Sequence, residues 1–161
     1  MSTKNAVAVG SVLTVGVSAS VLFAAALATS PSLSLLDGER FTLVKQAQIR
    51  VLQVSMTLIS TAYTVFAVWL LVIARKENNA QVFRLTLIAL LLIVAAILYS
   101  VPTDIAYNQQ ILSWNPAAPP ADWAAVRDAW DLSNMLRAVP SLLAFALQTF
   151  AMLSLEAKSA S

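Results

Sequence analysis

The chain has 161 residues, of which 59% are hydrophobic and 11% are charged, whereas a soluble domain carries about 25% charged residues. It contains neither cysteine nor histidine, which excludes disulfides, zinc or haem sites built on these residues, and serine–histidine or cysteine–histidine catalytic units. The net charge of +2 is too small and too scattered for a nucleic-acid-binding surface. These values indicate a small membrane protein with a single domain over residues 1–161.

Four stretches of the chain carry no charged residue: residues 6–28, 51–74, 85–101 and 138–155. A hydrocarbon core about 30 Å thick needs roughly 20 apolar residues in a helix, and all four stretches are near that length. None shows the strict alternation of a β-strand, so each is predicted to be a transmembrane helix. The predicted fold is therefore all-α, a multi-pass integral membrane four-helix bundle.

The first stretch also resembles a signal peptide, because Ala26-Leu27-Ala28 looks like a cleavage site. It is longer than the usual apolar core of a signal peptide, and we expect it to remain as a span. Four spans place both termini on one side of the membrane. The short loop at residues 75–84 is rich in Lys and Arg, and such loops favour the cytoplasm. We therefore expect cytoplasmic termini in the cell membrane.

The third loop, residues 102–137, is unusually long and contains three of the four tryptophans. Loops of this length are usually functional. Pro116, Pro119 and Pro120 predict an irregular stretch, and Asp122 is then a suitable N-cap for a helix that runs into the fourth span. We expect this partly helical loop to cap one end of the bundle.

Polar residues follow helical spacing both in this loop and within the spans. One stripe has the spacing 4, 3, 4, 3 and 4 and consists of Trp123, Arg127, Trp130, Asn134, Arg137 and Ser141. Gln53 begins a second polar face in the second span, and Gln148 lies in the fourth. Polar side chains in a span face the bundle interior or a wet cavity. Two interpretations remain open: separate hydrogen bonds between helices, or convergence on one cavity.

Residues 107–137 carry the motifs Asn108-x2-Ile111-x2-Trp114, Pro120-x2-Trp123-x3-Arg127-x2-Trp130 and Asn134-x2-Arg137. In these motifs the chain resembles the DUF1772 family, also called the anthrone oxygenase-like family, whose members are small four-span membrane proteins. Members with an assigned role oxidise anthrones to anthraquinones with dioxygen, without metal or flavin. The resemblance implies a monooxygenase without a cofactor, which acts on a hydrophobic aromatic molecule.

The resemblance also implies a set of site residues. Substrate contacts would come from Trp114, Trp123, Arg127, Trp130 and Asn134, and we add Gln53 and Gln148 from the polar faces of the spans. Asn108 and Arg137 would stabilise an oxyanion. Because the chain has no histidine, Asp104 is the best-placed base, directly after the third span. No metal ligand is expected.

Each of these residues also has a structural interpretation. The tryptophans could form a belt at the membrane interface. Arg127 could form a surface pair with Asp131, and Arg137 could snorkel to the headgroups or pin the loop by bonding Asn108 and Asp104. The alternative function is then a non-catalytic protein that binds a lipid or a small hydrophobic molecule, or an assembly partner. A transporter is the third hypothesis. Membrane lipids are the expected surroundings, and the sequence does not indicate an oligomer.

Overall fold

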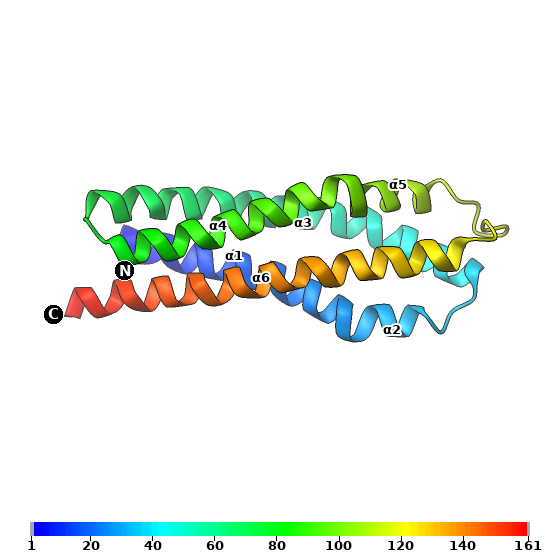
Figure 1. The fold of residues 1–161 in the computed structure, drawn as a ribbon, viewed down its shortest axis with the longest axis horizontal. Helices are drawn as coiled ribbons and strands as arrows, with labels where there is room; N and C mark the ends of the chain where they lie inside the picture. Colours follow the sequence, from blue (N-terminus) through cyan, green and yellow to red (C-terminus); the bar gives the residue numbers. More distant parts are fainter. Residues whose placement is uncertain (1, 161) are drawn as a thin grey trace.

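Four long helices lie side by side in the computed structural model, which describes the backbone of residues 2–160 and the side chains of residues 2–155 (Figure 1). The elements are α1 (Thr3–Ala24), the π-helical turn η1 (Ala25–Thr29), α2 (Ser30–Leu33), α3 (Gly38–Lys76), α4 (Ala80–Ser100), the π-helical turn η2 (Val101–Ile105), α5 (Ala106–Leu112) and α6 (Trp123–Ala160). Four of the described helices are long and apolar enough to cross a membrane, which fits the predicted multi-pass protein, and the helical elements confirm the all-α class. Both termini lie at the same end of the bundle (Figure 1).

Polar caps set the starts of three of the long helices. The side chains of Ser2, Asp37 and Asn79 accept hydrogen bonds from backbone N–H groups in the first turns of α1, α3 and α4. Asp37 is thus the N-cap of α3. Asn78 has φ of 52°, a left-handed conformation that Asn tolerates, and it closes the tight hairpin between α3 and α4.

Two prolines coincide with the two π-helical turns. Pro102 lies inside η2, and Pro31 follows η1. A proline has no N–H to donate and its ring crowds the carbonyl four residues earlier, so the helix widens locally and continues. The chain therefore stays helical from Ala80 to Leu112, and only residues 113–122 of the predicted third loop lie outside helices.

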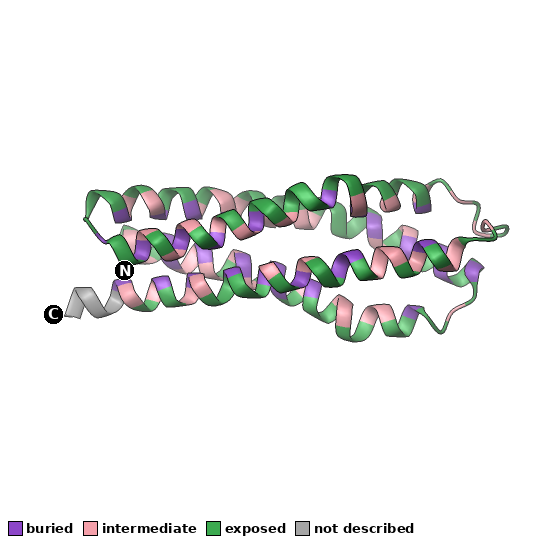
Figure 2. Cartoon of the chain, viewed as in Figure 1, coloured by how far each residue is buried: buried purple, intermediate pink, exposed green. Residues whose placement is uncertain are grey.

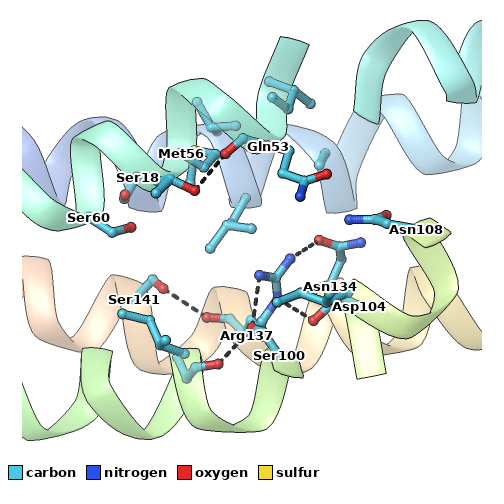
Figure 3. A pocket seen from close by; sticks show the side chains of 18 of the residues that line it. Ser18, Gln53, Met56, Ser60, Ser100, Asp104, Asn108, Asn134, Arg137 and Ser141 are labelled. Atoms are coloured by element: carbon cyan, nitrogen blue, oxygen red, sulfur yellow. Dashed lines mark hydrogen bonds and ion pairs between the residues drawn. The ribbon is translucent and has the colours of Figure 1, made fainter. Parts of the chain in front are cut away.

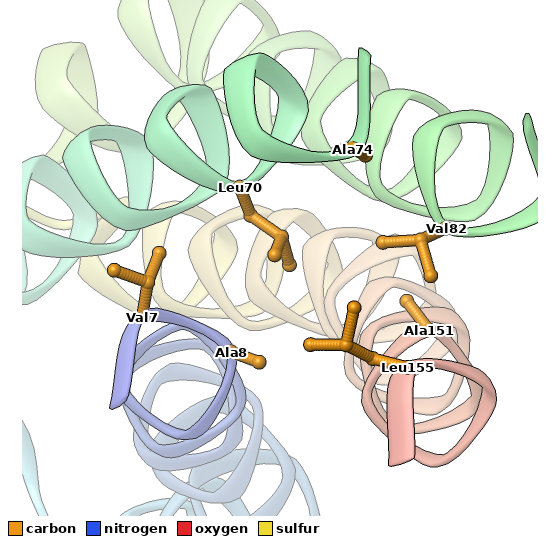
Figure 4. Close-up of a cluster of buried hydrophobic side chains, with 7 residues drawn as sticks. All are labelled: Val7, Ala8, Leu70, Ala74, Val82, Ala151 and Leu155. Atoms are coloured by element: carbon orange, nitrogen blue, oxygen red, sulfur yellow. The ribbon is translucent and has the colours of Figure 1, made fainter. Parts of the chain in front are cut away.

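The helices pack around the bundle axis in a ring, with α1 and α4 each in contact with both α3 and α6. Buried positions lie on the faces that the helices turn toward one another, whereas most outward positions are exposed (Figure 2). Small side chains make up much of the interior, which lets helices approach closely in lipid. At the end with the termini, all four helices contribute to one apolar cluster (Figure 4), which consists of Val7, Ala8, Leu70, Ala74, Val82, Ala151 and Leu155.

Candidate functional site

A cavity of about 430 Å³ lies between the helices, and Figure 3 shows side chains that line it. Residues from α1, η1, α3, α4, η2, α5 and α6 line it. On α3 the lining runs from Lys45 to Thr64, roughly 28 Å along the helix axis at 1.5 Å per residue. This volume is within the range of about 300–1,000 Å³ that is typical of small-molecule sites.

The cavity opens sideways between α3 and the α4–η2 segment. Six of the lining residues are also exposed: Leu52, Gln53, Thr57 and Thr61 on α3, Ile97 on α4 and Ile105 in η2. Most of these lie within the uncharged stretches of α3 and α4 that are long enough to cross a membrane. The opening therefore faces the lipid and suits a ligand that partitions into the bilayer.

Arg137 and Asp104 form an ion pair at the polar end of the cavity (Figure 3). Arg137 Nε lies 2.8 Å from Asp104 Oδ2, although the N–H is not directed along a hydrogen bond. Arg137 Nη1 donates to Ser100 Oγ at 3.0 Å, and Nη2 donates to Asn134 Oδ1 at 2.6 Å. Every nitrogen of the guanidinium group is thus engaged, and α6 is tied to α4 and η2.

Asp104 keeps one oxygen available. The residue is 2% exposed, and its Oδ1 has no hydrogen-bond partner among the described residues. Its position follows from η2, because the wide turn at Pro102 lets the helix continue while Asp104 lines the cavity. A buried carboxylate oxygen without a donor is costly, and at the wall of a cavity it is suited to accept a proton or a hydrogen bond from a ligand.

Trp130 is held in place by both neighbouring asparagines. Its Nε1 donates to Asn108 Oδ1 at 2.8 Å, and its carbonyl accepts from Asn134 Nδ2 at 3.2 Å. Asn108 therefore joins α5 to α6, and its amide nitrogen has no acceptor in the described part of the chain. All three residues line the cavity. The tryptophan ring provides a flat, rigid wall.

Lys45 is a cavity residue that the sequence analysis missed. It is 1% exposed, and its Nζ lies 2.9 Å from the centroid of the Trp130 ring. Removing an ammonium group from water costs several kcal/mol, and a desolvated cation–π contact returns about 2 kcal/mol. The signal was present in the sequence, since Gly38, Phe41, Thr42, Lys45 and Ile49 have the spacing of one buried helix face.

The rest of the lining is apolar with scattered hydroxyl groups. Thr57, Thr61 and Thr64 on α3 donate to carbonyls four residues earlier, at 2.7, 2.8 and 2.9 Å, so their oxygens remain as acceptors only. These residues share the polar face that begins at Gln53, which also lines the cavity. At the far end, the buried Tyr63 hydroxyl has no partner among the described residues. It is free to donate to a ligand.

Other predicted site residues lie outside the cavity, at the loop of residues 113–122. Trp123 packs on Phe41, with ring centroids 5.5 Å apart, and beneath Arg127 at 5.1 Å. Arg127 pairs with Asp128 at 2.8 Å, so the alternative pair with Asp131 is wrong. Trp114 packs in an apolar cluster under the loop, and its carbonyl accepts from Gln46 Nε2 at 3.0 Å. These contacts hold the loop on α3 and α6.

Gln148 is also placed away from the cavity, in the bundle interior. It is fully buried, and its Nε2 donates to Ser11 Oγ at 2.9 Å and to Thr86 Oγ1 at 3.5 Å. Of the two interpretations of polar residues in the spans, hydrogen bonding between helices therefore describes Gln148, whereas convergence on a cavity describes Gln53.

The site is amphiphilic in its chemistry. At its polar end an amino group and an amide nitrogen can donate, and Asp104 Oδ1 can accept. Among residues 2–155, no three carboxylates come together in a way that could hold a metal ion. No protein-family model, curated protein or solved structure matches this chain.

Proposed function

We propose that this protein is an integral membrane oxygenase of the DUF1772, or anthrone oxygenase-like, type. It oxidises an anthrone-like aromatic molecule to a quinone with dioxygen, and it needs no metal or organic cofactor. The observation that carries the proposal is the cavity, which joins an opening toward the lipid to a polar end where Asp104 Oδ1 has no partner among residues 2–155. An aromatic molecule dissolved in the bilayer can reach the carboxylate by this route.

In this reaction the base removes a proton from the ring methylene carbon, and the C–H electron pair passes into the ring and onto the carbonyl oxygen. The resulting oxyanion gives electrons to dioxygen, a carbon–oxygen bond forms, and the hydroperoxide loses water. One anthrone and one dioxygen thus yield one anthraquinone and one water. The methylene carbon loses four electrons, and the dioxygen gains them.

The roles of the residues follow from their positions. Asp104 is the base, through Oδ1, while its ion pair with Arg137 fixes the carboxylate. The oxyanion is stabilised by donors at the same end of the cavity, the Asn108 amide nitrogen and the Lys45 amino group. Trp130 forms the wall against which the ring system lies.

The polar end of the cavity is lined by residues of η2, α5 and the first half of α6, and these segments lie away from the termini (Figure 1). The basic residues Arg75, Lys76 and Arg84 lie at or near the hairpin between α3 and α4, at the end with the termini. With this end in the cytoplasm, the polar end of the cavity lies toward the outer face of the cell membrane.

A non-catalytic protein that binds a lipid is the second candidate. Two observations favour it: the cavity runs roughly 28 Å along α3, a length that suits an extended alkyl chain, and the Asp104–Arg137 pair by itself joins η2 to α6. The test is incubation of the purified protein with an anthrone and dioxygen. The oxygenase forms quinone faster than buffer does, whereas a lipid-binding protein leaves the rate unchanged.

A further inference from the structure

Lys45 differs from the other cation at the cavity in having no carboxylate in direct contact, since Asp131 and Asp104 act on it only from a longer range. Arg137 has Asp104, Ser100 and Asn134 around its guanidinium group. No carboxylate of residues 2–155 lies within ion-pair distance of Lys45 Nζ, although the residue is 1% exposed. A buried amino group at a cavity wall without an acceptor is an incomplete site.

The surroundings of Lys45 define what would complete the site. The Trp130 ring covers one side of Nζ, at 2.9 Å, and Trp130 is itself fixed by Asn108. An ammonium group has three donors and no acceptor, so at least one N–H can point into the cavity. The Asn108 amide nitrogen adds a second donor at the same end. Two neighbouring donors with no acceptor of their own favour a ligand group that only accepts.

We propose that the ligand of this cavity carries an acidic group, a carboxylate or an acidic phenol, at one end of an apolar body, and that Lys45 binds this group. The apolar body then extends along α3 toward Tyr63, past the opening between α3 and α4. An acid that arrives ionised pairs with the ammonium form.

This inference rests on one part of the proposed function, namely that the cavity binds a ligand, and it does not require the oxygenase activity. An aromatic acid and a fatty acid share the required chemistry, so the experiment includes both. The probe is anthracene-2-carboxylate, whose binding is followed by energy transfer from tryptophan in detergent micelles without oxygen. Anthracene-2-carboxamide is the neutral counterpart, and palmitate is the competitor. The variants are K45M, K45R and the control K76M, which removes an exposed lysine at the other end of α3.

The wild-type protein is expected to bind the carboxylate roughly 10- to 100-fold more tightly than the carboxamide, the usual range for a charge-assisted hydrogen bond. K45M loses this preference, K45R retains part of it, and K76M behaves as wild type. Displacement of the probe by palmitate identifies fatty acids as ligands, and probe binding that palmitate leaves unchanged identifies aromatic acids. Either result supports a site for an acid.

Equal affinities of the wild type for carboxylate and carboxamide would overturn the inference, and this comparison holds even where K45M does not fold. A full preference in folded K45M, or no binding of either probe, would overturn it as well. Turnover separates the two proposals. If the protein oxidises a neutral anthrone but shows no preference for acids, only the acid-binding inference is wrong. If it shows a preference for acids that depends on Lys45 but oxidises no anthrone, only the proposed oxygenase activity is wrong.

Discussion

Removing one member of the Asp104–Arg137 ion pair should destabilise the protein far more than removing both. The Asp104 side chain is 3% exposed and the Arg137 side chain is 22% exposed. Breaking a fully buried pair costs roughly 3–5 kcal/mol, because one charge is left without a partner. Since Arg137 keeps some contact with solvent, we expect a loss of about 3 kcal/mol in the free energy of unfolding for D104N and for R137M.

The double variant D104N/R137M leaves no charge at this position, so its loss should be only about 1 kcal/mol. Reversible unfolding in mixed micelles, followed by circular dichroism, measures all three values. Coupling between the two sites would then be several kcal/mol. Losses that simply add in the double variant would refute the reasoning, because they would mean that the two groups do not interact.

Three further substitutions test the packing around the site. G38A places a Cβ 2.9 Å from Trp123 Nε1, so it should shift the tryptophan fluorescence and lower the free energy of unfolding by about 1–3 kcal/mol. An unchanged fluorescence spectrum and melting temperature would contradict this close contact. Q148L removes the bond to Ser11 and should lower stability by about 1 kcal/mol while ligand affinity stays the same, and altered affinity would place Gln148 in the site. W130F keeps an aromatic ring over Lys45 but loses the Nε1 donor, so it should lower the free energy of unfolding by about 1 kcal/mol, as measured by thermal unfolding. Unchanged stability would contradict the role of that hydrogen bond.

The membrane helices could be predicted from the sequence because an uncharged stretch of about 20 residues satisfies its backbone hydrogen bonds in lipid by forming a helix. The start of α6 at Trp123, directly after Asp122 and the prolines, was predicted for the same kind of local reason. The helical continuation through residues 102–112 was missed. Pro102 indicates a helix end in the sequence, but a π-helical turn absorbs it in the fold.

The candidate site was only partly predictable. Helical spacing shows which residues share one face of a helix, but it does not show which other element packs against that face. The stripe from Trp123 to Ser141 does share one face of α6, yet Trp123 packs on α3 and Arg127 lies over the Trp123 ring. Only Trp130 and the later residues of the stripe reach the cavity. Gln53 and Gln148 look alike in the sequence. One lies beside the cavity and the other bonds across the bundle, a difference set by the packing of the whole bundle.

Lys45 shows a different limit of the sequence. A lysine outside the uncharged stretches is most simply assigned to solvent, and so it was not considered for the site. Its helical register with Phe41 and Ile49 contradicts that assignment, because α3 begins at Gly38, well before the membrane. At 39 residues, α3 is about 58 Å long, nearly twice the thickness of a hydrocarbon core.

The rate of quinone formation by D104N tests the central claim most directly. Purified wild-type protein, D104N and the control D122N are each incubated with an anthrone and dioxygen, and rates are normalised to folded protein. We expect one quinone per dioxygen with the wild type and a rate at least about 100-fold lower with D104N. D122N should leave the rate unchanged, because Asp122 is exposed and does not line the cavity. A D104N rate equal to that of the wild type would contradict the assignment of Asp104 as the base.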